Sequence, residues 1–201
     1  MAEAAMENPA GGSSYPVQFS VDYPESSSRL KALFRIILII PIGVILNLVS
    51  GIIGALFPAI VLMLLFRKKY PRWWFDVNVE LQRFSARVWT YFFLLRDEYP
   101  STNEQQAVHL DFEYPEGDNA VNRWLPLIKW LLALPHWIII SVLSIVYLIV
   151  VVISWFAIII TGKHPRGLFD FLIGCSRWAA RTTAYAFLLT TDRYPPFRFG
   201  P

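Results

Sequence analysis

The chain has 201 residues, of which 55% are hydrophobic and only 16% are charged, and its formal net charge is +3. An ordinary soluble domain carries more charge than this, so the composition favours a protein that is embedded in a membrane. The basic residues gather beside apolar blocks and the net charge is small, so nucleic acid is not an expected partner. The single cysteine, Cys175, excludes a disulfide within the chain.

Residues 1–15 are mostly small and polar, and they include glycine, proline and serine. They lack the basic start and the apolar stretch that a signal peptide requires. We predict a disordered tail over this segment.

Two short segments alternate apolar and polar residues, a pattern typical of a half-buried strand. The first, 17–23, ends before Pro24, and the second, 108–114, ends before Pro115. Because an isolated strand pair is only marginally stable in water, we expect the two to pair with each other, or with the C-terminal segment YPPFRF, against a helical layer. Candidate helix N-caps follow each strand: Ser26, Ser27 and Ser28 in the first case, Asp118 and Asn119 in the second.

Two apolar blocks, 36–66 and 130–160, each contain 31 residues without Asp, Glu, Lys or Arg. Each block is longer than the roughly 20 residues of one membrane-spanning helix. Two buried core helices of a soluble protein are the alternative, but they would need a much larger protein around them.

Basic residues flank both ends of each block, and such residues mark the cytoplasmic side of a membrane. We therefore predict a transmembrane helical hairpin for each block, because a hairpin returns both ends to that side. Turn-forming residues at 47–51 support this prediction in the first block, whereas the second has only Ser141 and Ser144 at that place. A re-entrant hairpin and one long tilted helix are the alternatives.

The order of residues is repeated at an offset of 94 positions, since KKYPRWWFD at 68–76 returns as GKHPRGLFD at 162–170. Lysine, proline, arginine, phenylalanine and aspartate occur in the same order in both. Composition alone does not produce such an order in a charge-poor chain, so we predict a tandem duplication. The predicted division is the tail at 1–15, membrane repeat 1 at 16–100, a linker at 101–106 and membrane repeat 2 at 107–201.

Each copy of this motif begins a segment with helical periodicity, polar on one face and apolar on the other. Arginines in the middle of such a helix make a free transmembrane span expensive, so we expect these helices on the cytoplasmic side. Their polar stripe has two interpretations. It forms structural ion pairs that clamp the repeats together, or it forms a basic pocket for lipid phosphates. The candidate residues are Arg72, Asp76, Arg83, Arg87, Arg166, Asp170, Arg177 and Arg181.

No catalytic motif accompanies these features. The sequence has no Gly-rich phosphate loop, no paired metal-ligand motif and no Gly-x-Ser-x-Gly, and its histidines at 109, 136 and 164 are scattered. We therefore assign no catalytic, cofactor-binding or metal-binding residue, expect no cofactor, and do not expect an enzyme.

The segment 162–197 resembles a bacterial membrane-protein family known as domain of unknown function 4389. The match consists of Pro-Arg-x-x-Phe-Asp after an apolar block, Arg-Trp-x-x-Arg in a helix, and a closing Asp-x-Tyr-Pro-Pro-Phe. The first repeat departs from the pattern, because Phe84 stands where the second has Trp178 and Ser101 where it has Pro196. The resemblance implies a bacterial inner-membrane protein and supplies no activity.

The expected fold is an all-α integral membrane protein with minor β structure. Each of its two tandem repeats contains a short strand, a transmembrane helical hairpin and a cytoplasmic-side amphipathic helix. We expect a multi-pass protein of the bacterial inner membrane with its N-terminus in the cytoplasm. The expected function is a non-enzymatic accessory or scaffold subunit of a membrane complex, with membrane lipids and other membrane-protein subunits as candidate partners. A small transporter or channel with a pathway between the repeats is the alternative.

Overall fold

A computed structural model describes residues 15–102, 104–115 and 121–200. All of the predicted tail except Tyr15 lies outside the described residues, as do the candidate caps Asp118 and Asn119. Tyr15 itself is buried. In chain order the elements are β1 (Val17–Val21), α1 (Arg29–Arg67), α2 (Arg72–Phe92), β2 (Val108–Phe112), the 3-10 turn η1 (Leu125–Leu127), α3 (Lys129–Leu132), α4 (Leu134–Thr161), α5 (Arg166–Thr183) and the π-helical turn η2 (Ala184–Leu188).

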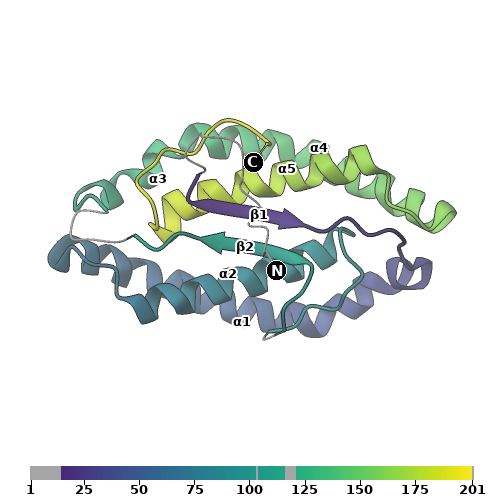
Figure 1. Cartoon of the computed structure of the whole chain (residues 1–201), viewed down its shortest axis with the longest axis horizontal. Helices are drawn as coiled ribbons and strands as arrows, with labels where there is room; N and C mark the ends of the chain where they lie inside the picture. Colours follow the sequence, from purple (N-terminus) through teal and green to yellow (C-terminus); the bar gives the residue numbers. More distant parts are fainter. Residues whose placement is uncertain (1–14, 103, 116–120, 201) are drawn as a thin grey trace, which may run out of the picture.

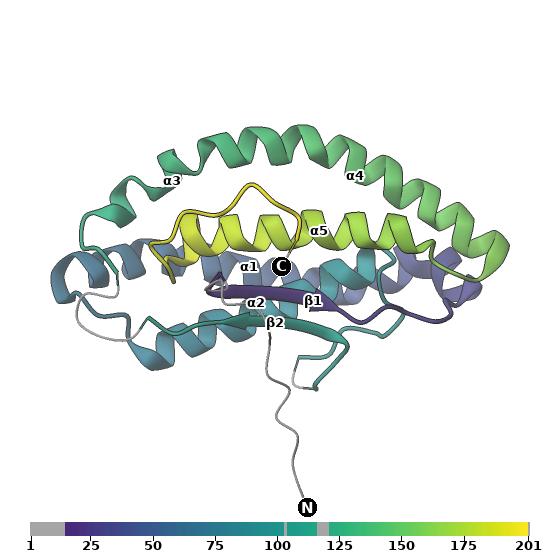
Figure 2. The ribbon, with the colours of Figure 1, turned by 45° about the horizontal axis from the view of Figure 1, so that its top comes forward.

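The elements form three layers, which Figures 1 and 2 show from two directions. A two-stranded sheet lies against the amphipathic helices α2 and α5. The long helices α1 and α4 pack on α2 and α5, and in Figure 2 α3 and α4 arch over α5 on the side away from the sheet. The amphipathic helices are therefore the middle layer.

The two strands pair with each other in an antiparallel register that brings Phe19 opposite Leu110. This confirms the first of the two pairings expected from the sequence. β1 packs on α5 and β2 packs on α2, so each strand rests on the amphipathic helix of the other repeat. The exchange ties the two halves of the chain into one core, in which Val17, Leu95, Leu172 and Leu188 are buried together.

The helical hairpin predicted for each apolar block is wrong. α1 runs without interruption for 39 residues through the expected turn at 47–51, about 58 Å at ~1.5 Å per residue. A continuous helix pairs its backbone groups internally, which an apolar environment requires and a turn does not provide. In the second block a short α3 and a long α4 meet at Ala133, two residues before Pro135, whose ring removes one helical donor and disfavours an unbroken helix.

Both long helices expose their apolar side chains. The most apolar window of α1 is only 12% buried and that of α4 only 11% buried, and each helix is long and apolar enough to cross a membrane. A core helix of a soluble protein would be mostly buried instead.

The repeated motif forms the same corner twice. α1 ends at Lys68 and α4 ends at Gly162, and both residues have positive φ angles, 55° and 72°. A left-handed residue here closes the helix by bonding back to its last turn, and glycine adopts this conformation without strain. Pro71 and Pro165 then stand directly before α2 and α5, and the amphipathic helices predicted after the motif are present.

Candidate functional site

Two arginines of the predicted stripe hold the exchanged strands. The Nε atom of Arg83 donates to the carbonyl oxygen of Leu110 at 2.8 Å, and that of Arg177 donates to the carbonyl oxygen of Phe19 at 2.9 Å. Arg83 and Arg177 are equivalent in the repeat, and Phe19 and Leu110 face each other in the sheet. A pseudo-twofold axis therefore passes through this strand pair and relates the two contacts.

The remaining contacts of these two arginines differ. Arg83 also forms ion pairs with Glu80 at 2.6 Å and with Asp111 at 2.8 Å. Burial lowers the pKa of Arg83, but the hydrogen bonds that it donates to these two carboxylates, and their negative charge, raise the pKa above its ordinary value. Arg177 has a carbonyl partner instead, Phe199 at 2.8 Å, and burial lowers its pKa.

The other two mid-helix arginines of the stripe also bond to backbone carbonyls. Arg87 donates to Ser101 and Arg181 donates to Gly200, both at 2.9 Å. Arg181 is fully buried, and its guanidinium lies 5.7 Å from the ring centre of Tyr15. The structure thus brings the four mid-helix arginines against the two strands, the linker residue Ser101 and the C-terminal segment of the protein itself.

The corner residues of the stripe are more exposed. Arg72 lies 3.5 Å from Asp76, and both side chains are more than half exposed. The guanidinium of Arg72 also lies over the ring of Tyr114, 4.4 Å from its centre. That of Arg166 lies over the ring of Tyr23, 4.5 Å from its centre. Arg166 and Asp170 are both exposed. Each corner therefore presents an arginine that rests on a tyrosine from the other repeat.

Sequence reasoning missed a second pair of equivalent contacts. Arg35 forms a buried ion pair with Asp97 and donates to the carbonyl oxygens of Tyr91 at 2.5 Å and Arg96 at 3.0 Å. In repeat 2 Lys129, fully buried, lies 2.6 Å from Asp192. Arg35 and Lys129 are 94 positions apart, and the two aspartates are 95 apart, so the repeat alignment could have found them.

In the pair of repeat 2, burial and the attraction of Asp192 act on the pKa of Lys129 in opposite directions. Lys129 Nζ donates to the carbonyl oxygen of Thr191 at 2.7 Å. Burial lowers the pKa of Lys129, while the hydrogen bond and the charge of Asp192 oppose that shift. Arg35 and Lys129 stand directly before the two apolar blocks, so each pair ties the start of a block to the chain that follows an amphipathic helix.

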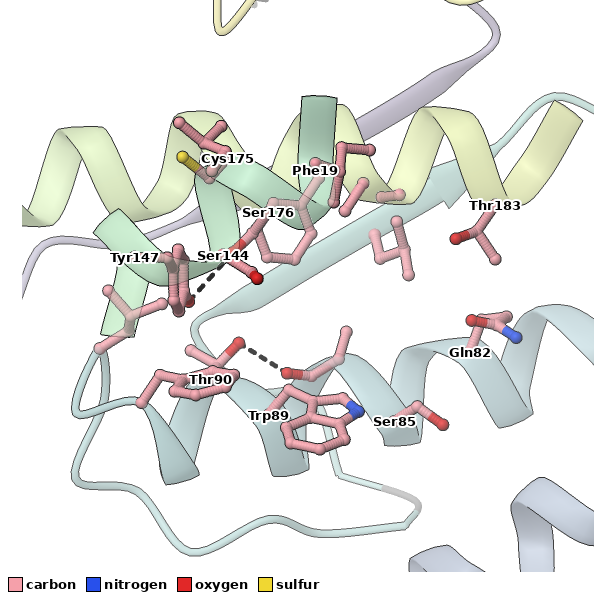
Figure 3. A pocket seen from close by; sticks show the side chains of 18 of the residues that line it. Phe19, Gln82, Ser85, Trp89, Thr90, Ser144, Tyr147, Cys175, Ser176 and Thr183 are labelled. Atoms are coloured by element: carbon pink, nitrogen blue, oxygen red, sulfur yellow. Dashed lines mark hydrogen bonds between the residues drawn. The ribbon is translucent and has the colours of Figure 1, made fainter. Parts of the chain in front are cut away.

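A cavity of about 520 Å³ lies between the long helices, the amphipathic helices and the strand pair (Figure 3). Many of its lining residues are equivalent in the two repeats: Phe19 and Leu110, Ser50 and Ser144, Gln82 and Ser176, Ser85 and Ala179, Ala86 and Ala180, Trp89 and Thr183. The cavity therefore lies on the pseudo-twofold axis.

The walls of the cavity are apolar and hydroxyl-bearing. Tyr147 and Ser176 are 3.4 Å apart through their hydroxyl oxygens, and Thr90 donates to the carbonyl oxygen of Ala86 at 2.6 Å. Burial raises the pKa of Cys175 to about 11, so its thiol stays protonated at neutral pH. A protonated thiol is a poor nucleophile, and the walls therefore suit binding rather than thiol chemistry.

The family model described as Domain of unknown function (DUF4389) matches residues 29–102 and 124–198. The chain belongs to this family. The two matches show two tandem family segments, each beginning near the start of an apolar helical segment. No curated protein and no solved structure matches the chain.

Proposed function

We propose that this DUF4389 protein is a non-enzymatic accessory or scaffold subunit that is seated in the bacterial inner membrane by its long helices. The observation that carries the proposal is the contrast between its two faces. α1 and α4 expose an almost continuous apolar layer, whereas the sheet on the opposite side exposes polar residues such as Ser20, Asp22, His109 and Asp111. Such a division suits a membrane boundary.

The packing of α1 favours a helix that lies along the membrane rather than one that crosses it upright. Its length of about 58 Å is nearly twice the ~30 Å hydrocarbon core. α1 packs on α2, and α2 carries Arg83 and Arg87 in its middle. An upright α1 would bring these charges into the hydrocarbon at a high cost. With α1 and α4 immersed in one leaflet, the sheet and the N-terminus face the cytoplasm.

Basic residues at the ends of the long helices support this seating. Arg67 and Lys68 end α1 beside Arg72, and all three are exposed. At the other end the backbone nitrogen of Ser27 donates to the carbonyl oxygen of Gly162 at 2.9 Å, so the start of α1 and the end of α4 form one edge. A basic residue near an anionic membrane surface contributes about 1 kcal/mol of binding. The proposed lipid-phosphate contacts therefore belong to these edges.

The contacts of the stripe favour a scaffold over a transporter. A pathway between the repeats would need Arg83, Arg87, Arg177 and Arg181 to line it, yet each donates to a backbone carbonyl within the protein. Arg83 and Arg177 stabilise the exchange of strands, which gives the cytoplasmic side a rigid polar surface suited to a partner subunit.

Cysteine labelling tests the seating. Single cysteines replace Arg29, Arg67 or the sheet residue Ser20 in a Cys175→Ala background, and an impermeant maleimide is added to right-side-out or inverted vesicles. All three positions should label only in inverted vesicles. Labelling of Arg29→Cys and Arg67→Cys from opposite sides would show that α1 crosses the membrane and would contradict the proposed seating.

Photocrosslinking tests the scaffold role. A photoreactive amino acid at Ser20, on the exposed sheet face, should crosslink to one discrete membrane-protein subunit in intact cells. The same group at Ala55, on the apolar face, is the control and should crosslink to lipid. An absence of protein adducts from Ser20 would contradict the scaffold role.

A further inference from the structure

The cavity on the pseudo-twofold axis has no part in the proposed scaffold role. Because it is lined by residues from both repeats, it exists only when the strands are exchanged and the four helices are assembled. We propose that this cavity binds one uncharged lipid of a single chain whose small head group carries hydroxyl or carbonyl oxygens. The route of entry, though not the binding chemistry, rests on the proposed membrane seating.

The size of the cavity fits such a ligand. Sites for small molecules enclose about 300–1,000 Å³, and this cavity encloses about 520 Å³. The space accommodates one aliphatic chain with a compact head group. A phospholipid with two chains would extend far outside it.

The absence of charge in the walls decides the class of head group. None of the lining residues that the structure describes is Asp, Glu, Lys or Arg. Burying an ionised head group without a charged partner costs far more than burying a hydroxyl or a carbonyl that forms hydrogen bonds. A phosphate or a carboxylate is therefore disfavoured inside, although the edges of the molecule carry exposed basic residues.

Three polar side chains in the cavity are available to the head group. Within the described residues, the Gln82 amide and the hydroxyls of Ser85 and Thr183 form no hydrogen bond, although all three line the cavity. Figure 3 shows Gln82 on α2 and Thr183 on α5 at facing sides of the cavity. An amide offers both donors and an acceptor, so Gln82 can bond a hydroxyl or a carbonyl of the ligand.

The rest of the wall suits an aliphatic chain. Trp89 and Phe93 of α2 line it together with Ile140 and Leu143 of α4. Trp89 is 50% exposed, and Ser144 is also exposed although both residues line the cavity. The cavity therefore opens to the outside beside the apolar layer, where a lipid in the membrane can enter.

Native mass spectrometry tests this inference with 1-monooleoylglycerol as the probe. The charged comparison is 1-oleoyl-glycerol 3-phosphate, which differs from the probe only by its phosphate. Wild-type protein in dodecyl maltoside should retain one molecule of the probe and at least tenfold less of the phosphate lipid. Equal retention of the two lipids would overturn the assignment of an uncharged head group.

Three variants, each with a matched control, locate the bound probe. Ala179→Phe and Ser85→Phe fill the cavity from α5 and α2, and each should lower retention at least tenfold, whereas Ala55→Phe on the exposed face of α1 should not. Gln82→Leu should lower retention about fivefold, as expected for one lost hydrogen bond, whereas Gln105→Leu in an exposed loop should not. Thermal unfolding followed by circular dichroism shows which variants are folded. If Ala179→Phe and Ser85→Phe do not fold, the retention of the probe by Gln82→Leu tests whether it binds in the cavity.

Retention in Ala179→Phe or Gln82→Leu that equals the controls would overturn the proposal, because the lipid would then lie on the outer surface. So would a wild-type protein that retains no probe. Neither result affects the labelling pattern of Arg29→Cys and Arg67→Cys, so a failed cavity and a failed membrane seating are distinguishable.

Discussion

In repeat 1 the apolar block forms a single helix from Arg29 to Arg67, whereas in repeat 2 the equivalent block is divided at Ala133 into α3 and α4. The exchanged strands and the amphipathic helices keep equivalent contacts in both repeats. Arg83 of α2 donates to the carbonyl oxygen of Leu110 in β2, and the equivalent Arg177 of α5 donates to the carbonyl oxygen of Phe19 in β1. The middle layer of the protein is therefore the part in which the repeats keep the same contacts, whereas the outer layer differs between them.

Among the contacts that are equivalent in the two repeats, we expect the ion pairs Arg35–Asp97 and Lys129–Asp192 to contribute most to stability. We expect Arg35→Leu and Lys129→Leu each to lower the free energy of unfolding by about 3 kcal/mol, because each leaves a partly buried aspartate without its cationic partner and at least one buried carbonyl without its donor. Thermal unfolding in detergent, followed by circular dichroism, measures the effect. Arg67→Leu at an exposed helix end is the control. If only one of the two variants is destabilised, the repeats are alike in geometry but not in energy.

The arginines that hold the exchanged strands should have a smaller effect. We expect Arg83→Leu and Arg177→Leu each to cost about 2 kcal/mol, since each removes a charged donor from a strand carbonyl. The same unfolding experiment measures this, with the exposed Arg72→Leu as a control that should cost under about 0.5 kcal/mol. If Arg83→Leu and Arg177→Leu lose as little free energy of unfolding as Arg72→Leu, the exchange of strands does not depend on these two arginines.

The smallest predicted effect comes from a difference between the repeats. His164 stands where repeat 1 has Tyr70, and it is fully buried with no hydrogen-bond partner for Nε2 among the described residues. Burial lowers the pKa of His164 most, the charge of Arg35 lowers it further, and a bond to Pro165 together with the charge of Asp97 opposes the shift. The unfolded chain therefore binds the proton more tightly than the folded chain.

The sign of the pH effect follows from this lowered pKa. Stability due to neutral His164 is complete above the ordinary pKa of 6.5 and is lost as the pH falls through the lower folded value. His164→Tyr should reduce the loss of stability between pH 7 and pH 5, measured as unfolding midpoints across that range. If the unfolding midpoint of His164→Tyr falls with pH as steeply as that of the wild-type protein, the pH effect does not come from His164.

Local patterns in the sequence were enough to predict several elements. The alternation at 17–23 and 108–114 predicted two strands, and the structure confirms both and their pairing. The helical periodicity after each repeated motif predicted α2 and α5. These signals succeed because the periods of strands and helices act over a few neighbouring residues. The offset of 94 also predicted the two segments that the family model matches.

The same local reasoning failed for the apolar blocks. Residues 47–51 have turn chemistry, yet they lie inside α1, because the helix keeps its own hydrogen bonds and packs along α2. Basic residues at both ends of a block are equally compatible with a hairpin and with a helix that lies along the membrane. Charge pattern alone does not distinguish these two geometries.

The sequence by itself determined the duplication, the amphipathic helices, the strand pair and the two long apolar segments. Only the tertiary structure decided that each strand rests on the helix of the other repeat, that Arg83 and Arg177 bond to strand carbonyls, and that a cavity forms on the axis between the repeats. The physical reason is distance along the chain. These features depend on contacts between residues far apart in sequence, which no periodicity within one segment encodes.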